Sequence, residues 1–285
     1  MTARVGVATC ADRPELDEDG PLLLAALRAA GLEPVVGVWD DPAVGWPGLD
    51  LVLVRSVWDY PRKHDAFLRW VRSCRRTVNP ADVLVWNTDK AYLDDLAAAG
   101  LPTVPTRFLA PGEAFEAPAH EHVVKPSVSG SAADTGRFPA GSDQGATLVA
   151  RLHAQGRTAM VQPYLDGIER DGETSLLFLG GTYSHARRRE PLLAQAGARE
   201  AVVVDDVLLT VRPTEPTPEQ RAVAEAALDA VPGGRGRLAY GRVDLVPGRD
   251  GPVLLELELT DCFLFLRSAT PQAVARLAAS VAAAL

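Results

Sequence analysis

The sequence predicts an α/β protein of three lobes, and two patterns support that prediction. Over the first third of the chain, apolar strands alternate with amphipathic helices, which is typical of a small parallel sheet covered by helices. Farther along, the strands become shorter and hairpins appear, which indicates mixed sheets. We therefore expect an N-terminal βαβ domain over 1–86, a small lobe over 87–165 and a mixed-sheet lobe over 166–285.

The expected elements of the first domain follow from hydrophobic periodicity. Val- and Leu-rich runs predict strands, and apolar residues three and four positions apart predict helices. In chain order these are strand 4–10, helix 21–30, strand 34–39, strand 49–56 and helix 64–76. A helix over 90–100, stopped by Gly100, opens the next lobe.

The second and third lobes contain turn and capping signals between their strands. The small lobe is expected to hold strands 103–109, 122–126 and 158–165 and a helix over 145–155. In the last lobe Gly180-Gly181 is expected to join strands 174–181 and 182–189 as a hairpin. Thr217, Pro218 and Gln220 are typical of a capping-box helix start. A hairpin over 238–259 follows, and then a C-terminal helix with Val274, Leu277, Val281 and Leu285 on one side.

Composition and charge exclude several classes of partner. A formal net charge of −8 argues against a nucleic-acid surface, which needs clustered excess Lys and Arg. The first ten residues hold too short an apolar run for a signal peptide, and we expect a cytoplasmic protein without a membrane partner. Cys10, Cys74 and Cys262 are widely spaced, which indicates reduced structural thiols.

The hairpin near the C-terminus carries the sharpest chemical pattern. Along 242–245 and 254–259, charged and apolar residues alternate, so Arg242, Asp244, Glu256 and Glu258 should share one face of the sheet. The turn between the strands places Asp244 close to opposite Glu256. Three neighbouring carboxylates repel one another unless cations or solvent relieve them, and hard oxygen ligands suit Mg²⁺. A solvated outer face is the alternative.

Two further segments are suited to binding a nucleotide. Lys125 ends an apolar strand and leads into a loop of small residues that includes Ser129, Gly130 and Ser131, whose backbone N–H groups can approach phosphates. The extended segment 162–165 crosses toward the last lobe, where its backbone can hydrogen-bond a purine edge. A flexible surface loop and a plain connecting strand are the respective alternatives. Lys63, Lys90 and Lys125 are the only lysines, which favours special positions for them.

The order of these segments resembles the ATP-grasp superfamily of ligases over nearly the whole chain. The resemblance implies ATP and Mg²⁺, with two ions expected, and it assigns a role to each segment. Lys90 and Lys125, with Ser129, Gly130 and Ser131, would contact phosphates, and Gln162, Pro163, Tyr164 and Leu165 would hold adenine. Glu173 would also bind ATP, and Asp244, Glu256 and Glu258 would bind metal, with Glu258 in place of the more usual Asn.

A narrower resemblance is to the bacterial group of D-cycloserine-forming cyclo-ligases, which close O-ureido-D-serine into a ring. The strings VWDDPAVGW, RSVWDYP, WNTDKAYL, VVKPSVSG, GGTYSHA and LLELELT carry it. The chain departs from that group after ELEL, where it reads Asp261-Cys262-Phe263-Leu264-Phe265 instead of EPSLF. If this stretch lines the acceptor pocket, the substrate differs.

The ATP-grasp resemblance implies that a carboxylate attacks the γ-phosphate and that an amine then opens the acyl phosphate. Lys125 and Arg242 are the expected catalytic cations. Loops after the carboxyl ends of parallel strands form clefts, and the Arg-rich strand 182–189 offers further cations. The expected substrate-side residues are Arg55, Ser56, Trp58, Asp59, Tyr60, Arg187 and Arg189. His185 stays unassigned.

Three hypotheses remain open from the sequence. The chain is a cyclo-ligase acting within one small amino-acid-like molecule, an intermolecular ligase that joins an amino acid or peptide to a carboxylate, or a nucleotide-binding module without turnover. The intact acids and lysines count against the third. A monomer and a homodimer are both compatible with the sequence.

Overall fold

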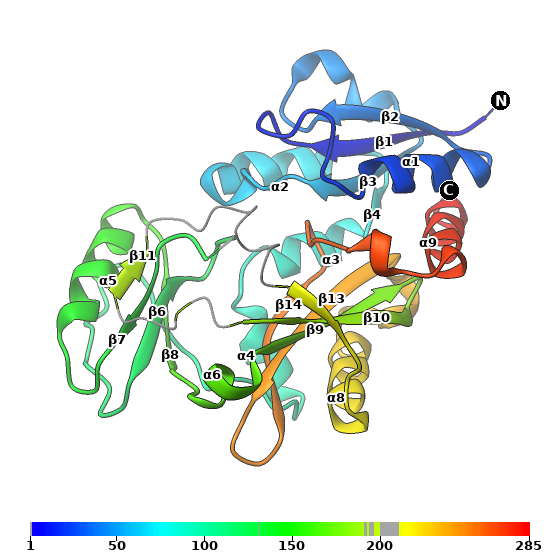
Figure 1. Cartoon of the computed structure of the whole chain (residues 1–285). Coiled ribbons are helices and arrows are strands. Elements are labelled where there is room, and N and C mark those ends of the chain that lie inside the picture. The colour runs from blue at the N-terminus through cyan, green and yellow to red at the C-terminus, as the bar shows by residue number, and fades with distance from the viewer. Residues whose placement is uncertain (1, 131, 191–192, 194–196, 200–210) are drawn as a thin grey trace.

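Three β-sheets organise the chain, one in each lobe, as Figure 1 shows for the computed structural model. The structure describes residues 2–130, 132–190, 193, 197–199 and 211–285. The N-terminal lobe consists of β1 (Arg4–Thr9), α1 (Gly20–Ala29), β2 (Glu33–Val38), β3 (Leu51–Ser56), α2 (His64–Ser73) and β4 (Thr77–Val78). Its strands pair in the order β2-β1-β3-β4 and are all parallel, which confirms the predicted βαβ arrangement.

Both faces of the N-terminal sheet are covered, so its central strands are buried throughout. Every residue of β3 is buried, which explains its continuous apolar run. On one face Leu23 and Leu27 of α1 pack against the sheet. On the other face Trp39 lies 5.4 Å from Phe67 and 5.7 Å from Trp70, measured between ring centroids.

The small lobe has a separate core under one helix. Its elements are β5 (Arg107–Leu109), β6 (His122–Pro126), β7 (Thr135–Phe138), α5 (Gln144–Ala154), β8 (Ala159–Pro163) and β11 (Gly197–Arg199). The strands form an antiparallel sheet in the order β11-β7-β6-β8-β5. Leu148, Val149 and Leu152 of α5 pack on Val124 and Val161. Strand β11 reaches this sheet from beyond residue 165, so the last third of the chain contributes to the small lobe.

The third lobe is an antiparallel sheet flanked by helices. It contains α6 (Gly167–Asp171), β9 (Glu173–Leu179), β10 (Thr182–Arg189), β12 (Val211–Thr214), α8 (Pro218–Asp229), β13 (Tyr240–Pro247), β14 (Pro252–Glu258) and α9 (Pro271–Ala283). Its order is β12-β10-β9-β13-β14. Gly180 and Gly181 have φ angles of 62° and 67°, as a tight hairpin turn requires. The capping box predicted at Thr217 and Gln220 is confirmed. Helix α9 ends before Leu285, which is exposed, so the prediction of Leu285 on its apolar face is wrong.

Two short helices between the first two sheets pack against the third sheet. Sequence analysis assigned no helix to 81–87, where the structure has α3 (Ala81–Asn87), and α4 (Tyr92–Ala98) begins two residues after Lys90. Tyr92, Leu93 and Leu96 pack in the same core as Leu176 and Phe178 of β9. Residues 81–98 therefore support the C-terminal sheet, and the exact division at 86/87 and 165/166 stays a prediction.

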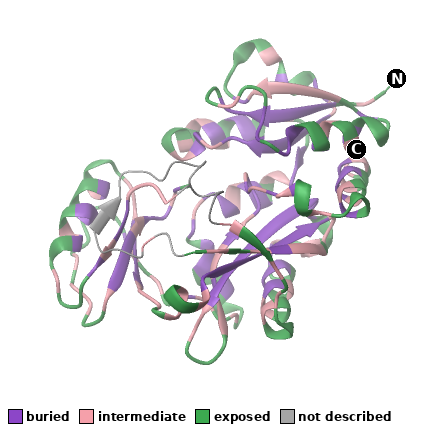
Figure 2. Cartoon of the chain, in the orientation of Figure 1, coloured by how far each residue is buried: buried purple, intermediate pink, exposed green. Residues whose placement is uncertain are grey.

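The N-terminal and C-terminal lobes share one core, whereas the small lobe does not join it. Leu23 and Leu53 belong to the same cluster as Leu177, Leu277 and Val281. Figure 2 shows buried strands in each lobe surrounded by exposed loops and helix faces. Among the helices of the described residues, none combines the length and apolarity needed to cross a bilayer.

Asn79 joins the N-terminal and C-terminal lobes through buried hydrogen bonds. Its Nδ2 donates to the carbonyl oxygens of Tyr240 (2.9 Å) and Leu259 (2.8 Å), and its Oδ1 accepts from the Ala239 N–H (2.9 Å). Asn79 is fully buried, so no solvent replaces these bonds. This side chain therefore holds the start of β13 and the end of β14 beside β4.

We expect Asn79→Ala to lower the free energy of unfolding by about 2–4 kcal/mol, because it leaves buried backbone groups without partners. Thr217→Ala, which removes one solvent-exposed cap, serves as a comparison and should cost about 1 kcal/mol. Urea denaturation followed by circular dichroism measures both. Equal losses in the two variants would contradict the role assigned to Asn79.

Candidate active site

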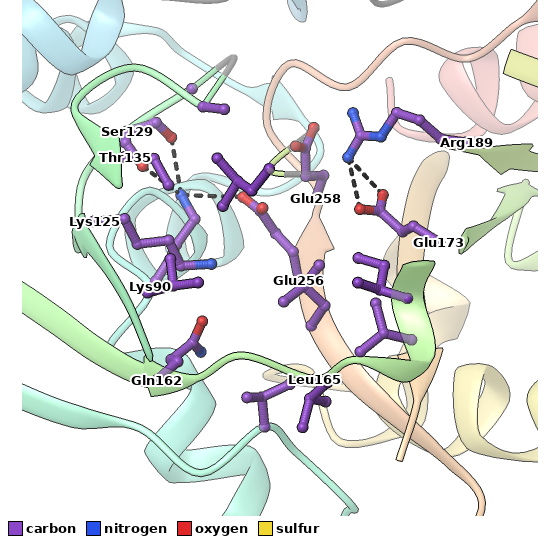
Figure 3. Close-up of a pocket in the computed structure, with 18 of the residues that line it drawn as sticks. Lys90, Lys125, Ser129, Thr135, Gln162, Leu165, Glu173, Arg189, Glu256 and Glu258 are labelled. Atoms are coloured by element: carbon purple, nitrogen blue, oxygen red, sulfur yellow. Dashed lines mark hydrogen bonds and ion pairs between the residues drawn. The ribbon is translucent and has the colours of Figure 1, made fainter. Parts of the chain in front are cut away.

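A cavity between the small lobe and the C-terminal sheet receives residues from all three lobes (Figure 3). Trp58 comes from the N-terminal lobe, Lys125 and Gln162 from the small lobe, and Glu173 and Glu256 from the C-terminal sheet. Segments that lie far apart in the sequence thus line one space. The expected nucleotide residues Lys90, Ser129, Gly130, Pro163, Tyr164 and Leu165 line it too, whereas Ser131 lies outside the described residues.

Antiparallel pairing of β13 and β14 brings three carboxylates together. Asp244 pairs with Glu256, as predicted, and Arg242 pairs with Glu258. One carboxylate oxygen from each of Asp244, Glu256 and Glu258 lies within 4.8 Å of the others. All three donors are hard oxygens from rigid strands, so the residues present fit a Mg²⁺ ion.

Two cations compensate these carboxylates. The Arg242 guanidinium donates from Nη2 to Asp244 Oδ2 (2.9 Å) and lies 2.8 Å from Glu258 Oε1. Lys90 Nζ lies 3.0 Å from Glu256 Oε1, and Ser175 Oγ donates to Asp244 Oδ1 at 2.6 Å. The acids and cations form one network in which each carboxylate has a positive neighbour or a hydrogen-bond donor.

The pKa values of two of these acids shift in opposite directions. Burial raises the pKa of Glu258 to about 8, and Glu256 and Asp244 add to that rise while Arg242 opposes it. Burial also acts on Glu256, but Lys90 and Lys125 outweigh it and keep its pKa below the ordinary value. Without a metal ion, the face therefore favours a proton on Glu258, which a divalent cation would displace.

The two lysines reach the cavity from different elements. Lys90, at the start of the segment that leads into α4, donates from Nζ to the Ser129 carbonyl oxygen (2.9 Å) and to Ser129 Oγ (3.2 Å). Lys125 ends the central strand of the small lobe, and burial lowers its pKa. Figure 3 shows both side chains on the side of the cavity opposite Glu173 and Arg189.

The linker 162–165 borders the cavity, but its glutamine side chain is already engaged. Gln162 Nε2 donates to Thr106 Oγ1 at 2.8 Å, and the residue is almost fully buried. The remaining lining near the linker is apolar and was not identified from the sequence; it consists of Val104, Val123, Ile168, Val246 and Leu255. These side chains come from five separate elements or loops, so no local motif reveals them.

Glu173 and Arg189 form an ion pair on the cavity wall, in which one guanidinium nitrogen donates to both carboxylate oxygens. Arg189 Nη2 lies 2.6 Å and 2.8 Å from the two carboxylate oxygens of Glu173. Burial raises the pKa of Glu173, and Arg189 opposes that rise. The expected ATP residue Glu173 and the expected substrate residue Arg189 therefore lie at one place.

Of the five substrate-side residues expected in the N-terminal lobe, the structure brings Trp58 to the cavity and not the other four. Arg55 lies 3.3 Å from Asp17 and donates to the Cys262 carbonyl oxygen. Ser56 and Tyr60 are buried, and Asp59 accepts from Trp39 Nε1 at 2.7 Å. All four side chains are therefore buried away from the cavity, and Arg55 reaches a backbone carbonyl of the C-terminal lobe.

The remaining residues singled out in the sequence differ in whether they reach the cavity. Arg187 lies over the ring of Phe265 at 5.3 Å and is absent from the cavity lining. Asp261 and Phe263, which carry the departure noted in the sequence, do line the cavity. The three cysteines are free.

Two comparisons identify the relatives of this chain. It is 36% identical over 264 residues to the cycloserine biosynthesis protein DcsG of Streptomyces lavendulae, covering 86% of this chain and 87% of that protein. A crystal structure of D-cycloserine synthetase DcsG superposes with a TM-score of 0.88 at 34% identity, covering 99% of both chains. The chain belongs to the DcsG family. The family model for the N-terminal domain of D-cycloserine synthetase DcsG matches residues 5–82.

More distant structures establish the fold of this DcsG-family chain as ATP-grasp. The D-alanine–D-alanine ligase of Bacillus anthracis superposes with a TM-score of 0.65 at 14% identity, covering 99% of this chain and 97% of that one. The ATP-grasp ligase PsnB, complexed with a minimal precursor, gives 0.62 at 20% identity, with both chains fully covered. The chain is thus an ATP-grasp carboxylate–amine ligase, which excludes the module without turnover. ATP-grasp ligases as a family use ATP and Mg²⁺.

His185, which the sequence left unassigned, lies on β10 among buried groups. Its Nδ1 lies 2.9 Å from Ser184 Oγ, and its Nε2 is buried without a partner among the described residues. Burial lowers the pKa of His185 to about 4; the Arg187 charge acts in the same direction, and backbone groups of Leu264 and Phe265 oppose it. The folded protein therefore favours the neutral ring.

Because the folded pKa of His185 lies below that of an unfolded histidine, about 6.5, the neutral ring stabilises the fold above that pH. This contribution is lost as the pH falls from about 6.5 through 4. We expect wild-type unfolding free energy to fall more steeply over this interval than that of His185→Gln, measured by urea denaturation at several pH values. Parallel pH profiles of the two proteins would contradict the assignment.

Proposed function

We propose that this chain closes a small amino-acid-derived substrate into a ring, in the manner of O-ureido-D-serine becoming D-cycloserine, with ATP and Mg²⁺. The proposal is supported by the 34–36% identity to proteins named for D-cycloserine synthesis. Coverage of 99% of both chains means that no lobe of that synthetase lacks a counterpart. A role in antibiotic biosynthesis follows from the same similarity.

The observation that carries the proposal is the gathering of three acids and two ammonium groups around one cavity. Glu256 and Glu258 line it from the C-terminal sheet with Asp244 beside them, Lys90 and Lys125 line it from other segments, and Lys90 Nζ lies 3.0 Å from Glu256 Oε1. A nucleotide triphosphate with divalent metal complements both sets, because metal bridges phosphate to carboxylate and ammonium groups bind phosphate oxygens directly.

Within this cavity, the substrate carboxylate would attack the γ-phosphorus of ATP, and ADP would leave. The oxygen-bound nitrogen of the ureido group in the same molecule would then attack the resulting acyl phosphate at its carbonyl carbon, lose a proton and expel inorganic phosphate, which closes the ring. Water would then cleave the carbamoyl group from that nitrogen, and the carbamate released would break down to carbon dioxide and ammonia. Lys90, Lys125 and Arg242 would hold the phosphoryl oxygens and offset the charge that develops on them. The carboxylate triad would hold two Mg²⁺ ions, which would neutralise phosphate charge.

The nucleotide base would occupy the apolar end of the cavity. Backbone groups of the linker 162–165 would read the adenine edge, since the Gln162 side chain is engaged by Thr106. The small lobe has its own core and would close over the nucleotide with Ser129 and Gly130 at the phosphates. Closure would exclude water that hydrolyses an acyl phosphate.

A substrate panel tests the proposal directly. We expect Mg²⁺-dependent ADP and phosphate formation with O-ureido-D-serine alone, and a cyclic product detected by mass spectrometry. D-Alanine and D-serine, each with and without a second amine, serve as controls for an intermolecular ligase. ADP formation that strictly requires the second amine would contradict ring closure and favour the intermolecular reaction.

Lys125→Met and Glu256→Gln should each lower kcat roughly 10²–10³-fold, the scale observed when one stabilising contact to developing charge is lost. Lys63→Met and Glu219→Gln make the same chemical changes at residues that do not line the cavity, and should retain wild-type rates. Coupled-assay ADP release measures all four. Wild-type turnover in Lys125→Met would remove this lysine from the phosphate site.

A further inference from the structure

The segment after the acidic hairpin has two different faces. Along 261–266 the residues alternate between half-buried and buried, as an extended chain requires. Cys262, Leu264 and Leu266 point into the core shared by the N-terminal and C-terminal lobes. Asp261 and Phe263 point the other way and line the cavity.

Aromatic rings border this end of the cavity. The ring of Phe263 lies 4.9 Å from that of Trp58, which belongs to the N-terminal lobe, and 5.9 Å from that of Phe265. The Arg13 guanidinium lies over the outer part of the stack, 5.3 Å from the Trp58 ring. Trp58 and Phe263 thus form a wall that joins two lobes, and both reach the cavity.

Asp261 lines the cavity, and its carboxylate forms no ion pair or hydrogen bond with the residues that the structure describes. Glu173, Glu256 and Glu258, which also line the cavity, and Asp244 beside them each contact an Arg or Lys. Arg242, Lys90 and Arg55 act on Asp261 only from a distance. A carboxylate that lines the same cavity as the Trp58 and Phe263 rings is suited to an ammonium group, which donates a charge-assisted hydrogen bond to the carboxylate and makes a cation–π contact with a ring.

The position of Asp261 fits the chemistry of an α-amino acid. Figure 3 shows Glu256 between Leu165 of the linker and Glu258, and the chain continues from Glu258 toward Asp261. Asp261 follows Glu258 by three residues, and both side chains line the cavity. In an α-amino acid only one carbon atom separates the nitrogen from the carboxyl carbon, so an ammonium site must adjoin the phosphoryl-transfer centre.

We infer that Asp261, with the ring faces of Trp58 and Phe263, binds the α-ammonium group of the substrate. The inference rests on the proposed function, and it restricts the substrate to small zwitterionic amino acids with a free α-amino group. Asp261 thus determines substrate specificity, while Lys125 and Arg242 bind the phosphoryl group.

The test compares Asp261→Asn with wild type on two ligands, O-ureido-D-serine and its analogue with hydroxyl in place of the α-amino group. Calorimetry on protein loaded with Mg²⁺ and a non-hydrolysable ATP analogue gives Kd, and ADP release gives kcat and KM. We expect Asp261→Asn to raise the Kd for the amino compound roughly 10–100-fold, the scale of the loss of a hydrogen bond to a charged group. The hydroxyl analogue should bind both proteins equally and weakly, and the KM for ATP should not change.

Phe263→Leu tests the aromatic wall, and Phe265→Leu is its control. Both substitutions remove a phenyl ring from the same pair of stacked rings, but Phe265 does not line the cavity. Phe263→Leu should raise the Kd for the amino compound about three- to fivefold, the scale of one exposed cation–π contact, while Phe265→Leu should leave this Kd unchanged.

Three results would overturn the inference. Equal affinity of Asp261→Asn and wild type for the amino compound would remove the ammonium site while leaving the proposed ligase intact. A large loss of kcat on both compounds with unchanged KM would make Asp261 a proton acceptor instead. Absence of binding and ADP formation in wild type with either compound would mean that the proposed substrate itself is wrong.

Discussion

The active site of this protein is organised around three mutually repelling carboxylates on two adjacent strands, whose charge must be compensated by cations. Asp244, Glu256 and Glu258 cannot separate, because antiparallel pairing fixes the backbone of β13 against β14. Arg242 and Lys90 relieve the repulsion from within the chain, and Lys90 in turn ties the loop at Ser129 to the acidic face. A region so charged and so enclosed is stable only with compensating cations, which is also the requirement of a metal-nucleotide site.

The division of the apolar cores explains how the lobes cooperate. The N-terminal and C-terminal lobes share a core and are joined by the Asn79 hydrogen bonds, so Trp58 is held against Phe263. The small lobe packs α5 on its own sheet and contributes Lys125 and Gln162 to the cavity. This architecture combines a fixed base, where acids and acceptor residues lie, with a separately packed lobe above the nucleotide position.

Local sequence patterns predicted the arrangement of the acidic hairpin better than the positions of the residues expected to contact the substrate. Strand alternation was sufficient to place Asp244 opposite Glu256, because register follows from the turn. It did not reveal that Arg55, Ser56, Asp59 and Tyr60 turn inward, since the partners of Arg55 and Asp59 include Cys262 and Trp39, which are remote in sequence. Helix α3 was missed because it is short and its packing partners belong to a lobe that begins far later.

By itself the sequence determined the three-lobe α/β class, the acidic hairpin, the two rare lysines at the cavity and the ATP-grasp order of segments. These depend on periodicity, turn chemistry and spacing, which act over a few residues. Only the tertiary structure decided that Trp58 meets Phe263, that Asp261 forms no ion pair with the described part of the chain, and that five apolar residues from separate elements line the cavity. Such contacts join residues up to about two hundred positions apart, and their geometry follows from packing of whole sheets and not from any local pattern.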